Sequence, residues 1–152
     1  MTEFGRRIHS TTGVCVSKVA ATKISGDLKI AIIHIGADCF LRTAYMPGSW
    51  DHRVSAWRRT ADTKRNVKTE TWSIAGPLCF SGDFVARNIP LPPLSRNDFV
   101  VIHDTGAYTL GMWSRYNSRR SPAVWGISED DSSSVVLLRR RESISDVGRF
   151  WD

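Results

Sequence analysis

The sequence predicts a mainly β fold, a Greek-key β-barrel or sandwich of about seven strands with little helix. Short apolar or alternating segments recur along the chain, and Gly, Pro, Asn and Asp residues separate them, as is typical of all-β domains. Helix signals are few by comparison. The chain has 152 residues, of which 41% are hydrophobic, which is enough for a single domain with its own core.

The predicted strands are residues 13–19, 28–35, 52–57, 69–74, 99–104, 123–127 and 134–139. Residues 28–35 form an apolar run typical of a buried strand. In residues 69–74 the side chains alternate, so that Glu70, Trp72 and Ile74 share one face. Residues 143–150 are predicted to form a short terminal helix, because Ser143 and Asp146 fit an N-cap pattern.

Two segments are predicted as connections. Residues 58–68 are polar with five basic residues, which favours an exposed loop. Residues 88–97 contain Pro90, Pro92 and Pro93, and proline removes a backbone donor and holds φ near −65°. We therefore expect residues 88–97 to be an extended, stiff connection and not a central strand.

Charge and cysteine content limit the function classes. Lys and Arg number 21 against 15 Asp and Glu, so the net charge is +6, and most of the basic residues are Arg. This composition suits a surface that binds an anion such as nucleic acid, a nucleotide or a phosphorylated cofactor, although a solvated basic surface explains it equally well.

The chain has three cysteines, Cys15, Cys39 and Cys79, which are far apart in the sequence. Their odd number and wide spacing predict neither a disulfide scaffold nor a metal site. No secretory signal or membrane-spanning run is evident, and we expect a reducing, cytoplasmic location.

Several blocks of residues together resemble one enzyme family. They are residues 76–79 (GPLC) with 81–83 (SGD), 97–98 (ND), 106–108 (GAY), and 116–119 (YNSR) with 122–123 (PA). Residues 3–6 (EFGR) and residues 38–45 (DCFLRTAY) also fit. In order and spacing the blocks resemble the C-terminal β-domain of the fold-type III, pyridoxal-phosphate-dependent decarboxylases of diaminopimelate, ornithine and arginine. The diaminopimelate branch is the most similar.

This resemblance implies a two-domain enzyme. The family has an N-terminal (β/α)8 barrel whose lysine forms a Schiff base with pyridoxal 5'-phosphate, and its active sites lie at a dimer interface. A chain of 152 residues has no room for that barrel, which needs ~250 residues. We therefore expect residues 1–12 to be a remnant of the end of the cofactor barrel and residues 13–152 to be the β-domain. Its partners would be the absent barrel, a second copy and a small amino-acid substrate, and alone it would be inactive.

The resemblance assigns roles to four residues at or near the cofactor. Cys79 matches the cysteine that handles the proton at the carbon losing CO2, and a thiol has a suitable pKa. Tyr108 matches the tyrosine that contacts the cofactor phosphate or lies beside the substrate, and the small residues before it would let the backbone approach the ligand. Glu3 matches the glutamate that pairs with the pyridine nitrogen, and Arg6 the arginine at the phosphate and substrate end. Because Glu3 and Arg6 are so near the start of the chain, we expect both to be frayed.

Three further positions concern the substrate. Arg42 resembles the clamp for the substrate carboxylate, although Thr43 stands where the family has proline. Tyr45 resembles a family tyrosine whose offset is uncertain by one residue. Phe80 replaces the acidic residue that holds the distal ammonium of the substrate, which implies a substrate without that group or with a more apolar tail.

Other interpretations remain open. Cys79 could be an inert buried cysteine and Tyr108 a packed core residue. The chain could be a non-catalytic, regulatory module derived from the same family. A basic nucleic-acid-binding β-domain is a third possibility, with Arg119–Arg120 and Arg139–Arg141 near aromatic residues. Trp50, Trp57 and Trp72 are interpreted as packing residues.

Overall fold

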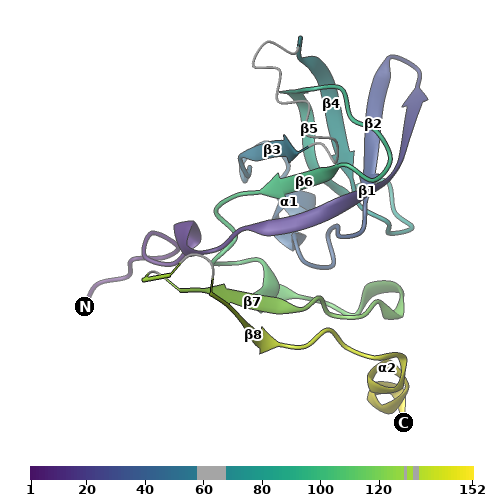
Figure 1. Cartoon of the computed structure of the whole chain (residues 1–152). Helices are drawn as coiled ribbons and strands as arrows, with labels where there is room; N and C mark the ends of the chain where they lie inside the picture. The colour runs from purple at the N-terminus through teal and green to yellow at the C-terminus, as the bar shows by residue number, and fades with distance from the viewer. Residues whose placement is uncertain (58–67, 129, 132–133) are drawn as a thin grey trace. The chain divides into compact units, whose positions relative to one another are not determined.

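The computed structural model describes residues 1–57, 68–128, 130–131 and 134–152, in two compact units (Figure 1). Unit 1, residues 1–114, contains η1 (Ser10–Thr12), β1 (Cys15–Ser25), β2 (Leu28–Ile33), α1 (Leu41–Tyr45), β3 (Val54–Trp57), β4 (Glu70–Ala75), β5 (Phe84–Leu91), β6 (Phe99–Ile102) and η2 (Leu110–Met112). Unit 2, residues 115–152, contains η3 (Tyr116–Ser118), β7 (Val124–Ile127), β8 (Val135–Arg139) and α2 (Ile144–Trp151). Apart from Lys68, the predicted loop 58–68 lies outside the described residues.

The six strands of unit 1 form one barrel-like sheet in the order β3-β6-β1-β2-β4-β5, which confirms the predicted mainly β fold. Among the strands that the structure describes, β2 and β4 are the pair that runs parallel. The first part of β1 pairs with β6 and its later part with β2, and the register shifts between Val19 and Ala21. Such an irregularity bends a strand and increases its twist. The edge strands β3 and β5 come into contact, so the sheet is nearly closed.

The prediction for residues 88–97 is correct in that none of them lies in a central strand, and wrong in that Asn88–Leu91 is not a connection. Asn88–Leu91 is the end of the edge strand β5, and β5 itself was not predicted. Pro90 is tolerated because β5 is an edge strand that pairs only with β4, where Pro90 lies opposite Thr71. Helix α1 was also not predicted. The remaining predicted strands are present with ends displaced by a few residues, the largest change being the extension of the first one to Ser25.

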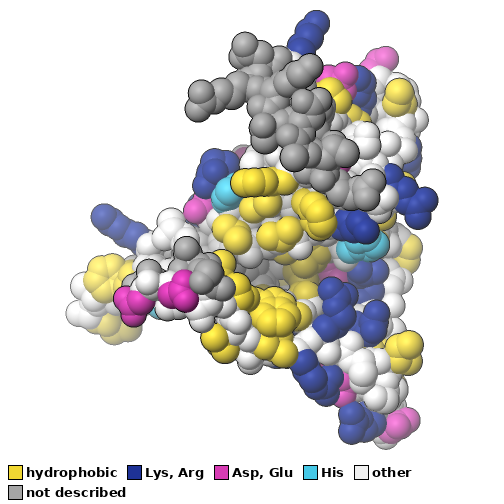
Figure 2. Space-filling view, viewed as in Figure 1, with side chains coloured by type: hydrophobic (Ala, Val, Ile, Leu, Met, Phe, Trp, Pro, Cys, Tyr) yellow, Lys and Arg dark blue, Asp and Glu magenta, His cyan; other side chains and the backbone are white. Residues whose placement is uncertain are grey.

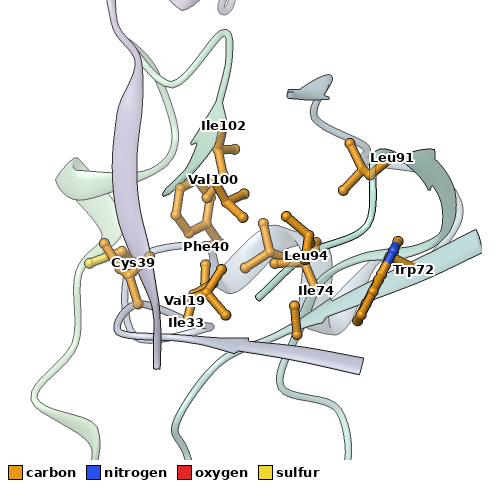
Figure 3. Packing of buried hydrophobic residues seen from close by; sticks show 13 residues of the cluster. Val19, Ile33, Cys39, Phe40, Trp72, Ile74, Leu91, Leu94, Val100 and Ile102 are labelled. Atoms are coloured by element: carbon orange, nitrogen blue, oxygen red, sulfur yellow. The ribbon is translucent and has the colours of Figure 1, made fainter. Parts of the chain in front are cut away.

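The core of unit 1 is a cluster of buried apolar side chains from five strands of the sheet and the loops beside it. Figure 3 shows Phe40 beside Val100 and Ile102 of β6, and Trp72 of β4 beneath Leu91. Burial of each such side chain contributes ~1.5–3 kcal/mol. Phe40 directly precedes α1, so its burial holds that helix against the sheet.

Unit 2 is built on a hairpin and a capped helix. Strands β7 and β8 were both predicted apart from their exact ends, and they pair antiparallel. The predicted N-cap at Ser143 is confirmed. Its hydroxyl accepts the backbone N–H of Asp146, and the carboxylate of Asp146 accepts the backbone N–H of Ser143. This reciprocal pair satisfies two donors at the start of α2.

A buried carboxylate, that of Asp83, joins two distant segments of unit 1. It accepts the backbone N–H of Ala37 at 2.7 Å and that of Leu78 at 2.6 Å. A Cβ atom at Gly36 or Gly76 would overlap the carboxylate, so both positions need glycine for this close approach. Asp83 therefore ties the loop between β4 and β5, which carries Cys79, to the end of β2.

A buried histidine lies at the start of β3. The Nδ1–H of His52 donates to the carbonyl of His103 at 3.0 Å, since a carbonyl can only accept, and the ring packs edge-on against Phe40. The pKa of His52 is lowered from its ordinary 6.5, chiefly because burial penalises the charged ring and further by the charge of Arg6, while the His103 carbonyl, Asp104 and Asp51 act in the opposite direction. The fold therefore favours the neutral imidazole.

We expect Asp83→Asn to lower the free energy of unfolding by about 1–3 kcal/mol. The amide group replaces one acceptor oxygen, which leaves a buried N–H of Ala37 or Leu78 without its partner. Urea denaturation measures the change. Asp27→Asn, the same substitution at an exposed turn position, serves as the control and should stay within about 0.5 kcal/mol of the unsubstituted chain. Equal stability of the two variants would show that the Asp83 contacts contribute nothing.

The lowered pKa of His52 predicts that the folded chain loses stability on acidification. The unfolded chain binds a proton at His52 near pH 6.5, and the folded chain only at lower pH, so the free energy of unfolding decreases as pH falls below about 6.5. His52→Asn keeps an N–H donor but does not titrate, and we expect a smaller loss of stability between pH 7.5 and 5.5 in urea denaturation. His9→Asn, at an exposed position, is the control. An unchanged pH dependence in His52→Asn would contradict this account.

Candidate functional site

Helix α1 positions Arg42 through the residue that follows it. The hydroxyl of Thr43, which is buried, lies 2.8 Å from the carbonyl oxygen of Phe40 and 3.1 Å from that of Phe84. These contacts hold the helix to the start of β5. Thr43 therefore anchors the segment by hydrogen bonding.

Arg42 belongs to a cluster with Arg6, Trp50 and Tyr108, which we call the arginine–aromatic cluster. The guanidinium carbon of Arg6 lies 4.1 Å from the centroid of the Trp50 ring. That of Arg42 lies 4.5 Å from the Trp50 ring and 4.4 Å from the Tyr108 ring. The Trp50 and Tyr108 rings meet edge to face, with centroids 5.7 Å apart and planes at 80°. The expectation that Arg6 is frayed is therefore wrong.

The two arginines give the cluster a positive charge. Among the residues that the structure describes, neither Arg6 nor Arg42 forms an ion pair. Within that part of the chain, the Nε of Arg42 and the Nε1 of Trp50 are also buried and lack a hydrogen-bond acceptor. Buried donors normally have a partner, so both atoms could donate to an acceptor such as an oxyanion.

Tyr108 reaches the cluster through a tight turn against the N-terminal segment. Its φ of +56° is unusual for a bulky residue and costs free energy. The N–H of Gly106 donates to the carbonyl of Ser10 at 3.0 Å, and a Cβ at Gly106 would overlap the backbone of His9. Gly106 thus approaches the backbone of the N-terminal segment closely, which brings the tyrosine turn next to the segment of Arg6.

Cys79 and Phe80 stand on the loop that Asp83 anchors. Both are exposed, Phe80 by 39%, and its ring packs against Gly82, where a Cβ would overlap it. Cys39 is buried and Cys15 partly so, and burial raises the pKa of the Cys15 thiol to about 12, which makes it unreactive. Cys79 is therefore the cysteine of this chain that a ligand or reagent can reach.

The remaining predicted residues are not placed in the cluster. Glu3 is exposed near the start of the chain, and Tyr45 is 51% exposed at the end of α1. Trp50, interpreted from the sequence as a packing residue, is the residue that sequence reasoning missed. The sequence around Trp50 does not show whether its ring packs in the core or contacts guanidinium groups. The contacts of Trp50 are made with residues 6, 42 and 108, which the tertiary fold brings together.

In unit 2 the basic side chains are largely engaged. Arg115 donates both arms of its guanidinium to Glu142, at 3.0 and 2.8 Å, which lowers the pKa of that carboxyl. Arg140 and Arg149 both pair with Asp146.

Among the residues described, no group of three or more His, Cys, Asp and Glu could hold a metal ion, and no helix is long and apolar enough to cross a membrane.

Comparison with known proteins identifies the family. The model described as "Pyridoxal-dependent decarboxylase, C-terminal sheet domain" matches residues 8–106. Diaminopimelate decarboxylase of Escherichia coli (strain K12) is 33% identical over 152 residues, covering 95% of this chain and 35% of the relative, and that of Streptomyces coelicolor is 34% identical, covering 95% and 33%.

Solved structures agree with this result. A crystal structure of diaminopimelate decarboxylase superposes with a TM-score of 0.83 at 30% identity, covering 97% of this chain and 35% of the other. The M. jannaschii diaminopimelate decarboxylase in co-complex with L-lysine gives 0.80 at 29% identity, covering 94% and 30%. The chain spans about a third of the length of these relatives. It belongs to the pyridoxal-dependent decarboxylases that act on ornithine, diaminopimelate and arginine, and corresponds to their C-terminal sheet domain.

Proposed function

We propose that this chain acts as the C-terminal domain of a pyridoxal-phosphate-dependent amino-acid decarboxylase similar to diaminopimelate decarboxylase. It supplies Cys79 and Tyr108 to active sites at a dimer interface, where a barrel domain holds the cofactor, and alone it has no activity. The observation that carries this proposal is the arginine–aromatic cluster, in which two arginines and a tyrosine that resemble family residues share one contact network.

The cluster suits the anionic groups that such an enzyme must hold. Arg6 and Tyr108 would bind the cofactor phosphate, and Arg42 would bind the substrate carboxylate with its planar fork. Glu3 would pair with the pyridine nitrogen. When bound, pyridoxal phosphate supplies an electron sink for the pair released with CO2. The unpaired guanidinium groups and the unbonded Nε of Arg42 fit these oxyanions.

Cys79 would handle a proton at the carbon that loses CO2. Its exposed position lets it reach a site formed with another domain or subunit. A thiol of ordinary pKa about 8.5 can be tuned to donate near neutral pH. Asp83 holds the loop, so the sulfur would be presented in a fixed position.

Exposed apolar side chains support a partner for both units. Figure 2 shows hydrophobic side chains gathered over β3 and β6 and, within unit 2, over β7 and β8. Trp57 is 66% exposed in unit 1, and Ile127 and Leu138 are 66% and 67% exposed in unit 2. Large exposed apolar patches mark interaction surfaces. We propose that the cofactor barrel and a second copy cover them.

The other interpretations find less support. In unit 2 the ion pairs of Arg115, Arg140 and Arg149 with Glu142 and Asp146 offset part of the positive charge that nucleic-acid binding would use. A regulatory module remains the alternative, because Phe80 replaces the acid expected for substrate binding. A measurement of catalysis by a complete enzyme that contains this domain distinguishes the enzymatic role from the regulatory role.

The proposal is tested with a chimera in which this chain replaces the matching part of E. coli diaminopimelate decarboxylase. We expect the chimera to release CO2 from an amino acid in a panel of substrates, and Cys79→Ala to lower kcat by about 10²–10⁴-fold, the contribution of a positioned proton donor. Ser81→Ala, in the same exposed loop, is the matched control and should change kcat little. Full activity of Cys79→Ala would remove Cys79 from the mechanism, and a folded, inactive chimera would favour the regulatory role.

The same chimera tests the proposed role of Phe80 in substrate choice. A charge-assisted hydrogen bond is worth about 1.5–3 kcal/mol, so we expect Phe80→Glu to raise kcat/KM for meso-diaminopimelate by roughly 10- to 150-fold. Phe80→Leu, which adds no charge, should not. If the chimera with Phe80 already prefers meso-diaminopimelate as strongly as the E. coli enzyme does, this assignment is wrong.

A further inference from the structure

Trp50 is the point at which the two arginines of the cluster meet. Arg6 approaches its ring from the N-terminal segment and Arg42 from α1, at 4.1 and 4.5 Å from the same centroid. Both distances are within the range in which a cation is attracted to an aromatic face. The ring is itself restrained by its edge contact with Tyr108.

Two like charges so close to one ring repel each other, and no described carboxylate pairs with either. The attraction of the indole face, which is the strongest among the aromatic side chains, offsets part of this repulsion. This attraction does not occupy the in-plane N–H donors of the two guanidinium groups, and neither group donates a hydrogen bond to another described residue. In the described residues, the Nε of Arg42 and the indole N–H are buried without an acceptor.

We propose that Trp50 is a positioning residue of the anion site, which holds Arg6 and Arg42 in place for a phosphate and a carboxylate before either ligand arrives. This inference rests on the proposed function of the two arginines and adds the residue that organises them. Without Trp50, Arg6 loses its aromatic contact, whereas Arg42 keeps its contact with Tyr108 at 4.4 Å.

That asymmetry gives a test in the 152-residue chain. Arginine side-chain protons that lie over an indole face are shifted upfield in NMR spectra, and Arg6→Lys and Arg42→Lys assign the two sets of signals. In Trp50→Leu we expect the Arg6 signals to return to the values of a solvated arginine, while the Arg42 signals keep a smaller upfield shift from Tyr108. A general loss of structure would remove both shifts.

Anion binding supplies the second measurement. We expect titrations with inorganic phosphate and with acetate to give dissociation constants about 2- to 30-fold weaker for Trp50→Leu, and an intermediate change for Trp50→Phe, which keeps an aromatic face. Trp57→Leu, at an exposed tryptophan of β3 outside the cluster, should bind both anions as tightly as the unsubstituted chain.

The outcomes separate this inference from the proposed function. Equal anion affinity in folded Trp50→Leu and in the unsubstituted chain overturns the role of Trp50 alone. An unsubstituted chain that binds neither phosphate nor acetate overturns both the role of Trp50 and the proposed anion site. If Trp50→Leu does not fold, Trp50→Phe decides, since unchanged affinity and unchanged Arg6 signals in that variant would also overturn the inference.

Discussion

The buried carboxylate of Asp83 is the contact on which the candidate site depends. It satisfies backbone donors from two segments, one at the end of β2 and one in the loop that follows β4. A buried charge is costly unless hydrogen bonds compensate it, so the two N–H groups and the carboxylate stabilise one another. The glycines at 36 and 76 allow this approach because a side chain at either position would occupy the space of the carboxylate.

From this contact the chain leads to both parts of the site. In one direction lies the loop with Cys79 and Phe80. In the other, the backbone held at Ala37 continues to Phe40, whose side chain is almost fully buried, and then to Arg42 and the cluster. The carboxylate of Asp83 thus holds the beginnings of two segments in place. These segments also meet at the hydrogen bond between Thr43 and Phe84, which are 41 residues apart in the sequence.

The parts of this protein that could be predicted from sequence are those set by local pattern. The apolar run that became β2 and the capping box at Ser143 are examples, because strand burial and N-capping depend on residues close in sequence. The prolines of residues 88–97 correctly argued against a central strand, but only the sheet order shows that Asn88–Leu91 continues an edge strand. Family motifs suggested Arg6, Arg42 and Tyr108 individually, but their common contact with Trp50 depends on the tertiary fold.

The arginines of the two units differ in their hydrogen bonds. In unit 2 the guanidinium of Arg115 donates to Glu142 and also lies 4.4 Å from the centroid of the Phe150 ring, and that of Arg140 donates to Asp146. In the arginine–aromatic cluster, by contrast, aromatic faces hold Arg6 and Arg42, and a π-face restrains a guanidinium without accepting its in-plane hydrogen bonds. A carboxylate partner would have restrained these arginines equally well but would have occupied the donors that a ligand needs. The use of rings in place of carboxylates therefore suits the anion site that we propose.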